Sequence, residues 1–218
     1  HKSSKVILIT SSIKGEGKTL TAINISLAFA SLNKRVLLIG CDLRNPQIHK
    51  YIDQDKNVEG VINFLVDKSF KWKNSVLKCF PKQPSHDIIL SGSLPPNPLN
   101  LINNGNLDLL LKEARNNYDY IFIDSAPTVL VADTKSIFKL SDAIIYLTRC
   151  NITEKAILNH IEDSYKESNN NVYALLNGVG ENNSYGYAYG YKYGYSYGYK
   201  YGYSYNYGYG YGYEEDKS

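Results

Sequence analysis

Short apolar runs alternate with longer amphipathic stretches along residues 1–184. The runs are nearly continuous in Val, Ile and Leu, which is typical of strands covered on both faces of a sheet. They predict strands over Lys5–Thr10, Arg35–Gly40, Tyr118–Asp124, Asp142–Thr148 and Val172–Leu176. The spacing of apolar positions between them predicts helices over Lys18–Leu32, Leu107–Asn116 and Glu154–Ser168, the last capped by Thr153. This succession predicts an α/β fold with a doubly wound, mainly parallel sheet.

The pattern changes after Ser184. Tyrosine occupies every odd position from 185 to 213, small or polar residues lie between, and YGYKYGYS recurs with a period of eight. Such alternation resembles a strand with one aromatic face, and an aggregation-prone strand is one interpretation. The abundant glycine and the lack of a second apolar face favour a segment that is disordered in isolation. We therefore expect a globular domain over residues 1–184 and a low-complexity tail over residues 185–218.

Composition excludes several classes of protein. Of the 21 tyrosines, 15 lie in the tail, so the remaining chain has an ordinary composition and can bury a core without disulfides or metals. The net charge of +3 is small for a nucleic-acid binder, and we expect no nucleic-acid partner. Three cysteines without a CxxC pair indicate a reducing compartment and no structural zinc. No apolar run spans a bilayer, no signal peptide opens the chain, and the absence of methionine suggests a fragment of a longer protein.

Two groups of polar residues carry no predicted function. The lysines of residues 67–86 are expected to form a solvated face of the protein. His49, His86 and His160 show no catalytic or metal-binding spacing, and we expect them at the surface.

A phosphate-binding loop follows the first predicted strand. The segment SSIKGEGKT, residues 11–19, leads directly into a predicted helix and ends in the GK[ST] of a Walker A motif, although Ser12 stands where the strict pattern has glycine. Glycines let backbone N–H groups turn toward a phosphate, and the helix N-terminus adds its dipole. Lys18 would reach the β and γ phosphates, and the hydroxyl of Thr19 would bind Mg²⁺. The predicted nucleotide contacts are Gly15, Glu16, Gly17, Lys18, Thr19 and Leu20.

Two aspartates close predicted strands. Asp124 ends the run YIFID in the manner of a Walker B strand, and Asp42 follows RVLLIGC. The carboxyl ends of parallel strands meet at one edge of a sheet, beside the loops that bind ligands. Each aspartate alone could merely cap a turn. Together with the phosphate loop, they predict a Mg²⁺ site made by Thr19, Asp42 and Asp124.

The motifs SSIKGEGKT, VLLIGCDLRNP, SGSLPPNP and YIFIDSAP, with the terminal tyrosine cluster, resemble those of the bacterial tyrosine kinases (BY-kinases) that act with polysaccharide co-polymerases. The fold of that family is a P-loop NTPase domain. Its second motif, Walker A′, reads D-x-D-x-R after a hydrophobic strand. Asp42 and Arg44 match the second acid and the arginine, but Gly40 replaces the first acid. Water, Asp42 or Asp124 would have to take over the role of that acid.

The resemblance implies a protein-tyrosine kinase that uses ATP and Mg²⁺, with Lys18, Asp42, Arg44 and Asp124 as catalytic residues. Asn177 resembles the asparagine that contacts adenine in related ATPases, while an asparagine that forms a turn before Gly178 explains it nearly as well. The implied phosphoacceptors are the tail tyrosines Tyr185, Tyr187, Tyr189, Tyr191, Tyr193, Tyr195, Tyr197, Tyr199, Tyr201, Tyr203, Tyr205, Tyr207, Tyr209, Tyr211 and Tyr213.

The resemblance also implies partners. The kinase would phosphorylate its tail in trans within a homo-oligomer and regulate capsule or exopolysaccharide synthesis or export. A membrane-spanning co-polymerase would activate it at the cytoplasmic face of the bacterial membrane, and a tyrosine phosphatase would reverse the reaction. The family's E-x-x-R-x-x-R helix, which joins protomers into a ring, has no match before Lys5. Ring formation would therefore belong to the full-length protein.

A different function stays open. Partition and site-selection ATPases share the fold, so the chain could be an ATPase switch or a nucleotide-bound scaffold. Those proteins carry a signature lysine five residues before the loop lysine, where this chain has Ile13, with Lys14 one position later. They do not usually end in a tyrosine array, and the kinase interpretation is preferred.

Overall fold

The computed structural model describes residues 4–93, 99–129, 133–159, 161–162, 166 and 171–180. The chain divides into two compact units, residues 1–179 and 180–218. The described residues belong to the first unit, except Gly180. The predicted tail with its phosphoacceptors and His160 therefore lie outside the described residues, and the boundary expected after residue 184 stays a prediction.

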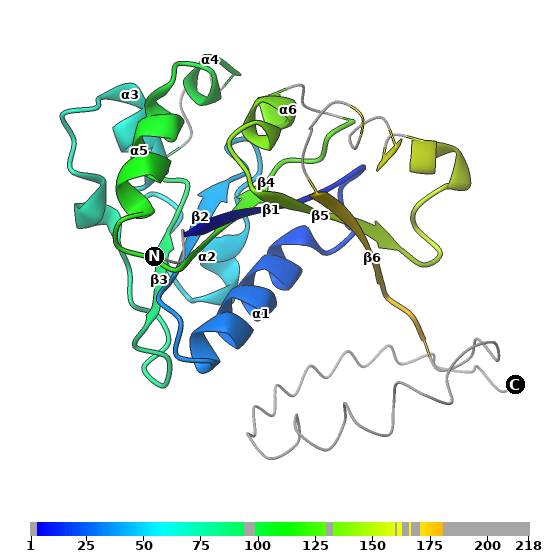
Figure 1. The fold of residues 1–218 in the computed structure, drawn as a ribbon, viewed down its shortest axis with the longest axis horizontal. Coiled ribbons are helices and arrows are strands. Elements are labelled where there is room, and N and C mark those ends of the chain that lie inside the picture. The colour runs from blue at the N-terminus through cyan, green and yellow to red at the C-terminus, as the bar shows by residue number, and fades with distance from the viewer. Residues whose placement is uncertain are drawn as a thin grey trace, which may run out of the picture. The chain divides into compact units, whose positions relative to one another are not determined.

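A six-stranded parallel sheet forms the centre of the first unit (Figure 1), with the strand order β3-β2-β4-β1-β5-β6. The predicted α/β fold with a doubly wound parallel sheet is confirmed. Four of the predicted strands, β2, β4, β1 and β5, are the inner strands of this order. Inner strands are covered on both faces, which agrees with their nearly continuous apolar runs. The strands are β1 Lys5–Ser11, β2 Val36–Cys41, β3 His86–Ile89, β4 Tyr120–Ser125, β5 Ala143–Arg149 and β6 Asn171–Asn177.

Helices cover both faces of this sheet. The long helix α1, Lys18–Ser31, packs on one face, where its Ala22 and Ile23 join a core with Leu38 and Phe122. The opposite core contains side chains of α3 and α5 against the other face of β1, β2 and β4. The remaining helices are α2 Ile48–Tyr51, α3 Val61–Val66, α4 Leu99–Ile102, α5 Asn106–Ala114 and α6 Asp133–Phe138. No described helix has both the length and the hydrophobicity that crossing a bilayer requires.

The last predicted helix differs from the observed one. A 3₁₀ helix, η2, spans Lys155–Leu158, and helical residues continue at 159, 161–162 and 166. Its N-cap is Glu154, and no side chain caps it by a hydrogen bond. The predicted cap by Thr153 is therefore wrong. Its hydroxyl instead bonds to the phosphate loop, as described below.

Residues 67–86 combine a solvated face with buried anchors. The lysines at 68, 71, 73, 78 and 82 are exposed, as predicted. Trp72 opens the 3₁₀ helix η1, Trp72–Ser75, and is buried, with its Nε1 donating to Glu113 Oε2 at 2.8 Å.

The prediction that His86 lies at the surface is wrong. It begins β3 fully buried against α1, with Nε2 2.8 Å from Ser26 Oγ.

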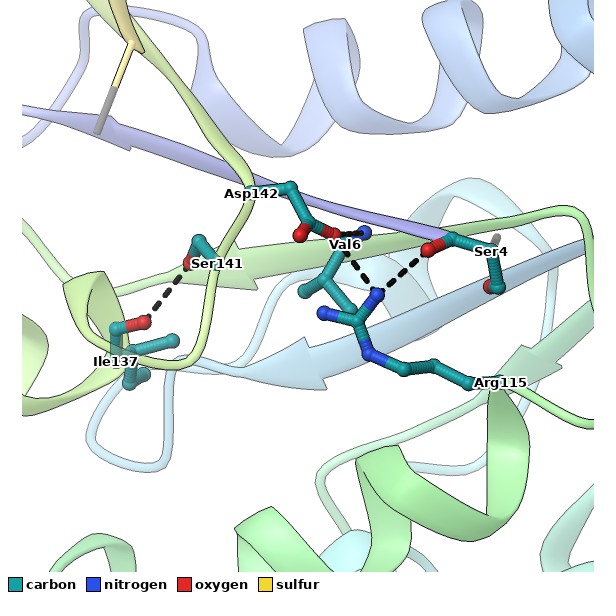
Figure 2. A network of polar contacts seen from close by, with 6 residues as sticks. All are labelled: Ser4, Val6, Arg115, Ile137, Ser141 and Asp142. Carbon is teal, nitrogen blue, oxygen red and sulfur yellow. Dashed lines mark hydrogen bonds and ion pairs between the residues drawn. The ribbon is translucent and has the colours of Figure 1, made fainter. Parts of the chain in front are cut away.

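A polar cluster fastens the amino end of the sheet (Figure 2). The Arg115 guanidinium donates to the Ser4 carbonyl at 2.6 Å and to Asp142 Oδ2 at 2.8 Å. The same carboxylate oxygen accepts the Val6 N–H at 2.7 Å, while the Asp142 N–H donates to the Val6 carbonyl at 2.8 Å. These four residues, the amino-end clamp, connect the beginnings of β1 and β5 to the end of α5. They thereby hold the strand that leads to the phosphate loop.

Candidate functional site

The phosphate loop connects the buried strand β1 to α1. Gly15 and Gly17 have φ angles of +91° and +98°, a region that favours glycine. Gly17 is the N-cap of α1 and has no capping side chain, so amide groups of the first turn remain for a ligand. A Cβ on Gly17 would lie 2.3 Å from Asn177 Nδ2, so the position also has no room for a side chain. The sequence pattern thus identified a loop with the geometry of a phosphate site.

Four of the predicted side chains come from the start of α1 and from the ends of β2 and β4, and they converge beside this loop. Asp124 lies in register with Ile9 of β1 and Gly40 of β2, which brings both carboxyl ends to one edge of the sheet. Thr19 Oγ1 donates to Asp124 Oδ2 at 2.8 Å. The ammonium of Lys18 interacts electrostatically with Asp124 and Asp42. Asp42 Oδ1 also accepts the Asn45 N–H at 3.0 Å, so the turn-capping interpretation holds for Asp42 in part.

The site concentrates buried negative charge. Asp124 is only 1% exposed. Burial raises its pKa to about 7, with the Thr19 hydrogen bond and the charge of Lys18 opposing the shift and Asp42 adding to it. Burial lowers the pKa of Lys18, while the carboxylates of Asp124, Asp42 and Glu16 raise it. Three carboxylates therefore act electrostatically on one ammonium group.

One oxygen of the site lacks a partner within the described chain. Asp124 Oδ1 is buried and accepts no hydrogen bond from any described residue. A buried carboxylate oxygen without a donor is costly unless a ligand satisfies it. Carboxylate and hydroxyl oxygens are the ligands that Mg²⁺ prefers. Thr19, Asp42 and Asp124 therefore fit a hard divalent cation in donor type and in charge.

Gly40 stands at a crowded position. A Cβ there would lie 3.0 Å from Ser91 Oγ, 3.2 Å from Ser91 N and 3.3 Å from Ile48 Cδ1. Ser91 Oγ donates to the Gly40 carbonyl at 2.9 Å and lies 3.4 Å from the Asp42 carbonyl. Neighbouring atoms therefore leave little room for a side chain at position 40, where the family pattern has an acid. The Ser91 hydroxyl holds the end of β2 by its bond to the Gly40 carbonyl.

The other predicted residues lie around the loop. Leu20 is exposed in the first turn of α1, and Arg44 is exposed beyond the end of β2. Asn177 Nδ2 donates to the Glu16 carbonyl at 2.9 Å, and its Oδ1 accepts the Gly178 N–H at 2.8 Å. The Asn177 side chain thus bonds to the loop and to its own neighbour, and its contact with adenine stays a prediction.

Several contacts of the loop escaped sequence reasoning. Arg149 Nη1 donates to the Gly15 carbonyl at 2.8 Å, and the Thr153 hydroxyl donates to Glu16 Oε1. Behind the loop, the buried Tyr146 hydroxyl lies 3.1 Å from Ser12 Oγ. The serine that departs from the strict Walker pattern thus has a partner in β5. None of these contacts has a local signal, because each joins the loop to a segment more than a hundred residues away.

Comparisons with known proteins agree with this geometry. A family model described as an AAA domain matches residues 4–174. Tyrosine-protein kinase YwqD of Bacillus subtilis (strain 168) is 31% identical over 186 residues, which cover 84% of this chain and 77% of the relative. The kinase domain of Escherichia coli tyrosine kinase ETK superposes with a TM-score of 0.76 at 23% identity, covering 88% of this chain and 74% of that one.

The wider fold extends to other ATPases. The septum site-determining protein MinD of Pyrococcus horikoshii OT3, solved with Mg-ADP, superposes with a TM-score of 0.63 at 20% identity. It covers 78% of this chain and 68% of that one, and this likeness shows the fold alone. The sequence matches decide between the two groups that share the fold, because the relative at 31% identity is a kinase. The chain belongs to the family of bacterial tyrosine-protein kinases.

Proposed function

We propose that this kinase transfers the γ-phosphoryl group of ATP to the tyrosines of its own C-terminal cluster, residues 185–213. The convergence of Lys18, Thr19 and Asp124 at the N-terminus of α1 carries the proposal, since these groups suit a nucleotide with its metal. Backbone N–H groups of Gly15, Glu16 and Gly17 bind phosphate oxygens in this proposal. The ammonium of Lys18 stabilises charge on the transferring group, and its buried surroundings strengthen the interaction.

Thr19, Asp42 and Asp124 would hold Mg²⁺. The metal, when bound, neutralises charge on the phosphates. The unpaired oxygen Asp124 Oδ1 and the excess of carboxylates beside Lys18 support this assignment. Asn177 would contact adenine at the far side of the loop, with Leu20 on the first turn of α1. Arg44 would face the phosphoryl group from the end of β2.

The transfer step needs an acceptor for the phenolic proton, because a tyrosine hydroxyl has a pKa of about 10. The tail oxygen attacks the γ-phosphorus and forms the new O–P bond. The bond to the bridging β–γ oxygen breaks, and ADP leaves with that electron pair. Asp42 is our first choice for the base that takes the proton, since it lies at the end of β2 beside Lys18. Asp124 is the alternative, with a pKa that burial raises to about 7, near the working pH.

The reach of the tail supports the proposal of transfer in trans. A chain of 34 residues without fixed structure spans roughly 30–35 Å and stretches to about 110 Å, so it can enter a neighbouring site. Each phosphate adds about −1.5 to −2 charges, so full modification of 15 tyrosines adds roughly −22 to −30. Such charge would drive protomers apart in a salt-dependent way.

The cellular role belongs to the same proposal. We place the kinase, as a homo-oligomer, at the cytoplasmic face of the bacterial membrane, where a membrane-spanning co-polymerase activates it and a tyrosine phosphatase opposes it. Cycles of phosphorylation would regulate capsule or exopolysaccharide synthesis or export. The kinase membership of the chain supports this placement.

A mixing experiment tests transfer. A Lys18→Met chain that carries the tail is incubated with Mg-ATP and an active chain truncated after residue 184, and phosphotyrosine is mapped by mass spectrometry. We expect phosphate on the tail of the inactive chain. The absence of phosphate from the tail of the inactive chain would exclude transfer in trans. The absence of phosphotyrosine from active full-length chains incubated with the cytoplasmic segment of their co-polymerase would overturn the proposal.

A nucleotide-dependent switch is the second candidate. The glycine in place of the first Walker A′ acid favours it, because one carboxylate that the family uses for the metal or the tyrosine is missing. Release of ADP without any phosphotyrosine would identify the switch. Binding of nucleotide without turnover would identify a scaffold.

A further inference from the structure

A carboxylate sits inside the loop that is proposed to bind phosphate. Glu16 lies between the two glycines of positive φ, and its side chain is fully buried. Its Oε2 accepts the Ile13 N–H at 2.8 Å, and its Oε1 accepts the Thr153 hydroxyl. A negative charge at this place would repel phosphate if it turned toward the ligand. Both of its oxygens are instead occupied by donors of the chain.

The turn after β5 aims the Thr153 hydroxyl at this carboxylate. The N–H groups of Ile152 and Thr153 both donate to the Arg149 carbonyl, at 3.2 and 2.9 Å, which closes the turn. Thr153 Oγ1 accepts the Arg149 N–H at 2.8 Å. Because one lone pair of that oxygen is used, its hydrogen is directed to Glu16. The turn therefore delivers a donor of fixed direction.

Two further donors hold the backbone of the loop. The Arg149 guanidinium donates to the Gly15 carbonyl at 2.8 Å, and Asn177 Nδ2 donates to the Glu16 carbonyl at 2.9 Å. In a trans peptide the C=O and the next N–H point in opposite directions. Fixing these carbonyls toward β5 and β6 therefore fixes the following N–H groups, of Glu16 and Gly17, toward the other side. The ends of β5 and β6 are joined by the Cys150 N–H, which donates to the Asn177 carbonyl at 3.0 Å.

We propose that Thr153 and Arg149 are positioning residues for the phosphate loop. Together with Glu16 they form a latch that holds the loop carboxylate away from the phosphates and the loop amides toward them. The inference rests on the proposed function, because it assumes that this loop binds the phosphates of the nucleotide. Neither residue needs to touch the nucleotide for this role.

The latch acts on the bound phosphates before and during transfer alike. Its loss should therefore weaken the binding of ADP and raise KM for ATP, with little change in kcat at saturating ATP. A purely structural role would instead lower thermal stability and leave the affinity of the folded protein unchanged. The split between affinity and kcat separates the two roles.

The test compares single substitutions of threonine in the full chain. Thr153→Val removes the hydroxyl with little change in shape, and we expect the Kd for Mg-ADP, measured by calorimetry, to rise about tenfold. Thr153→Ser keeps the hydroxyl and should stay within about twofold of the wild type. Thr148→Val is the matched control, because it makes the same change five residues before Thr153, where the hydroxyl bonds to the Leu175 carbonyl and to no other described residue.

A double-mutant cycle isolates the role of the charge. Glu16→Gln keeps the shape of the side chain and removes its charge, so Thr153→Val in that background should change Kd by no more than about twofold. The inference would be overturned if Thr153→Val raised Kd by the same factor in the wild type and in Glu16→Gln. It would also be overturned if Thr153→Val and Thr148→Val raised Kd equally. If Thr153→Val alone fails to fold, the Kd values of Glu16→Gln and the double variant are compared, and a difference of more than about twofold overturns the inference. A wild-type chain that binds no Mg-ADP would overturn the proposed function as well, whereas normal binding by Thr153→Val would overturn only the latch.

Discussion

The carboxylates at the two ends of the sheet differ in how far the chain pairs them. At the amino end, the carboxylate of Asp142 is paired with the Arg115 guanidinium and accepts a backbone N–H. At the carboxyl end, Asp124 is more deeply buried, interacts with the carboxylate of Asp42 and has an oxygen, Oδ1, that accepts no hydrogen bond from any described residue. The same strand, β1, begins at the first cluster and ends at the second.

This difference separates stability from function. The charged groups of the amino-end clamp are paired with one another, although the buried Ser4 Oγ has no partner among the described residues, so the clamp serves the fold. An unsatisfied buried carboxylate beside a helix N-terminus is destabilising by itself and is improved by a cation or a nucleotide. Proteins keep such local conflicts chiefly at functional sites. The first two predictions below therefore make equivalent changes at both ends of the sheet.

The largest expected effect is on activity at the carboxyl end. Lys18→Met should lower the rate of phosphotyrosine formation by about 10²–10³-fold or more, because the buried ammonium that faces the phosphates is lost. Lys5→Met makes the same change at the exposed beginning of β1 and should leave the rate within about twofold. Rates are measured at saturating Mg-ATP, with circular dichroism to check the fold. Equal rates for the two variants would contradict the assignment of function to the carboxyl end of the sheet.

The second prediction concerns the sign of a stability change. Asp124→Asn should raise the free energy of unfolding of the nucleotide-free protein by about 1–3 kcal/mol, because it removes a buried charge and still accepts the Thr19 hydrogen bond. Asp142→Asn should lower it by about 1–2 kcal/mol, because the bond to the Arg115 guanidinium loses its ionic part. Urea unfolding measures both. Two changes of the same sign would contradict the comparison.

Whether the sequence predicts the structure of each end depends on how far apart in the chain the contacting residues lie. The phosphate loop and the strands that carry Asp42 and Asp124 were predictable, because continuous apolar runs and a glycine-rich loop are local patterns. The amino-end clamp was not, since Ser4, Arg115 and Asp142 meet only after the sheet has formed. Strand β3 escaped because it has only four residues. The burial of His86 and the Thr153 latch depend on the same long-range pairing.

The third prediction uses pH to compare two buried groups. Burial lowers the pKa of His86 to about 4, below the value of about 6.5 in an unfolded chain. Between these values only the unfolded chain binds the proton, so His86 makes the protein less stable as the pH falls, by about 1–2 kcal/mol from pH 6.5 to 4.5. Asp124 acts in the opposite sense. Its raised pKa lets the folded protein bind a proton between about pH 7 and 4, so its contribution to stability increases as the pH falls.

Single variants separate the two contributions. Asp124→Asn should steepen the loss of stability between pH 7 and 5, since it leaves His86 unopposed, while His86→Gln should flatten it. The measurement is the midpoint of urea unfolding at each pH. A steeper loss in His86→Gln than in the wild type would show that the assignment of the two groups is wrong.

The smallest expected effect concerns the glycine that replaces an acid at the functional end. A Cβ on Gly40 would press on Ser91 Oγ at 3.0 Å, and that hydroxyl fastens the Gly40 carbonyl. Gly40→Ala should therefore lower the free energy of unfolding by about 0.5–1 kcal/mol, with little effect on the Kd for Mg-ADP. Ser91→Ala removes the nearest of the contacting atoms, so the double variant should be more stable than the sum of the two single changes implies, by about 0.5 kcal/mol. Strict additivity would mean that the strand end tolerates a side chain here. In that case the missing acid would reflect the chemistry of the site rather than its packing.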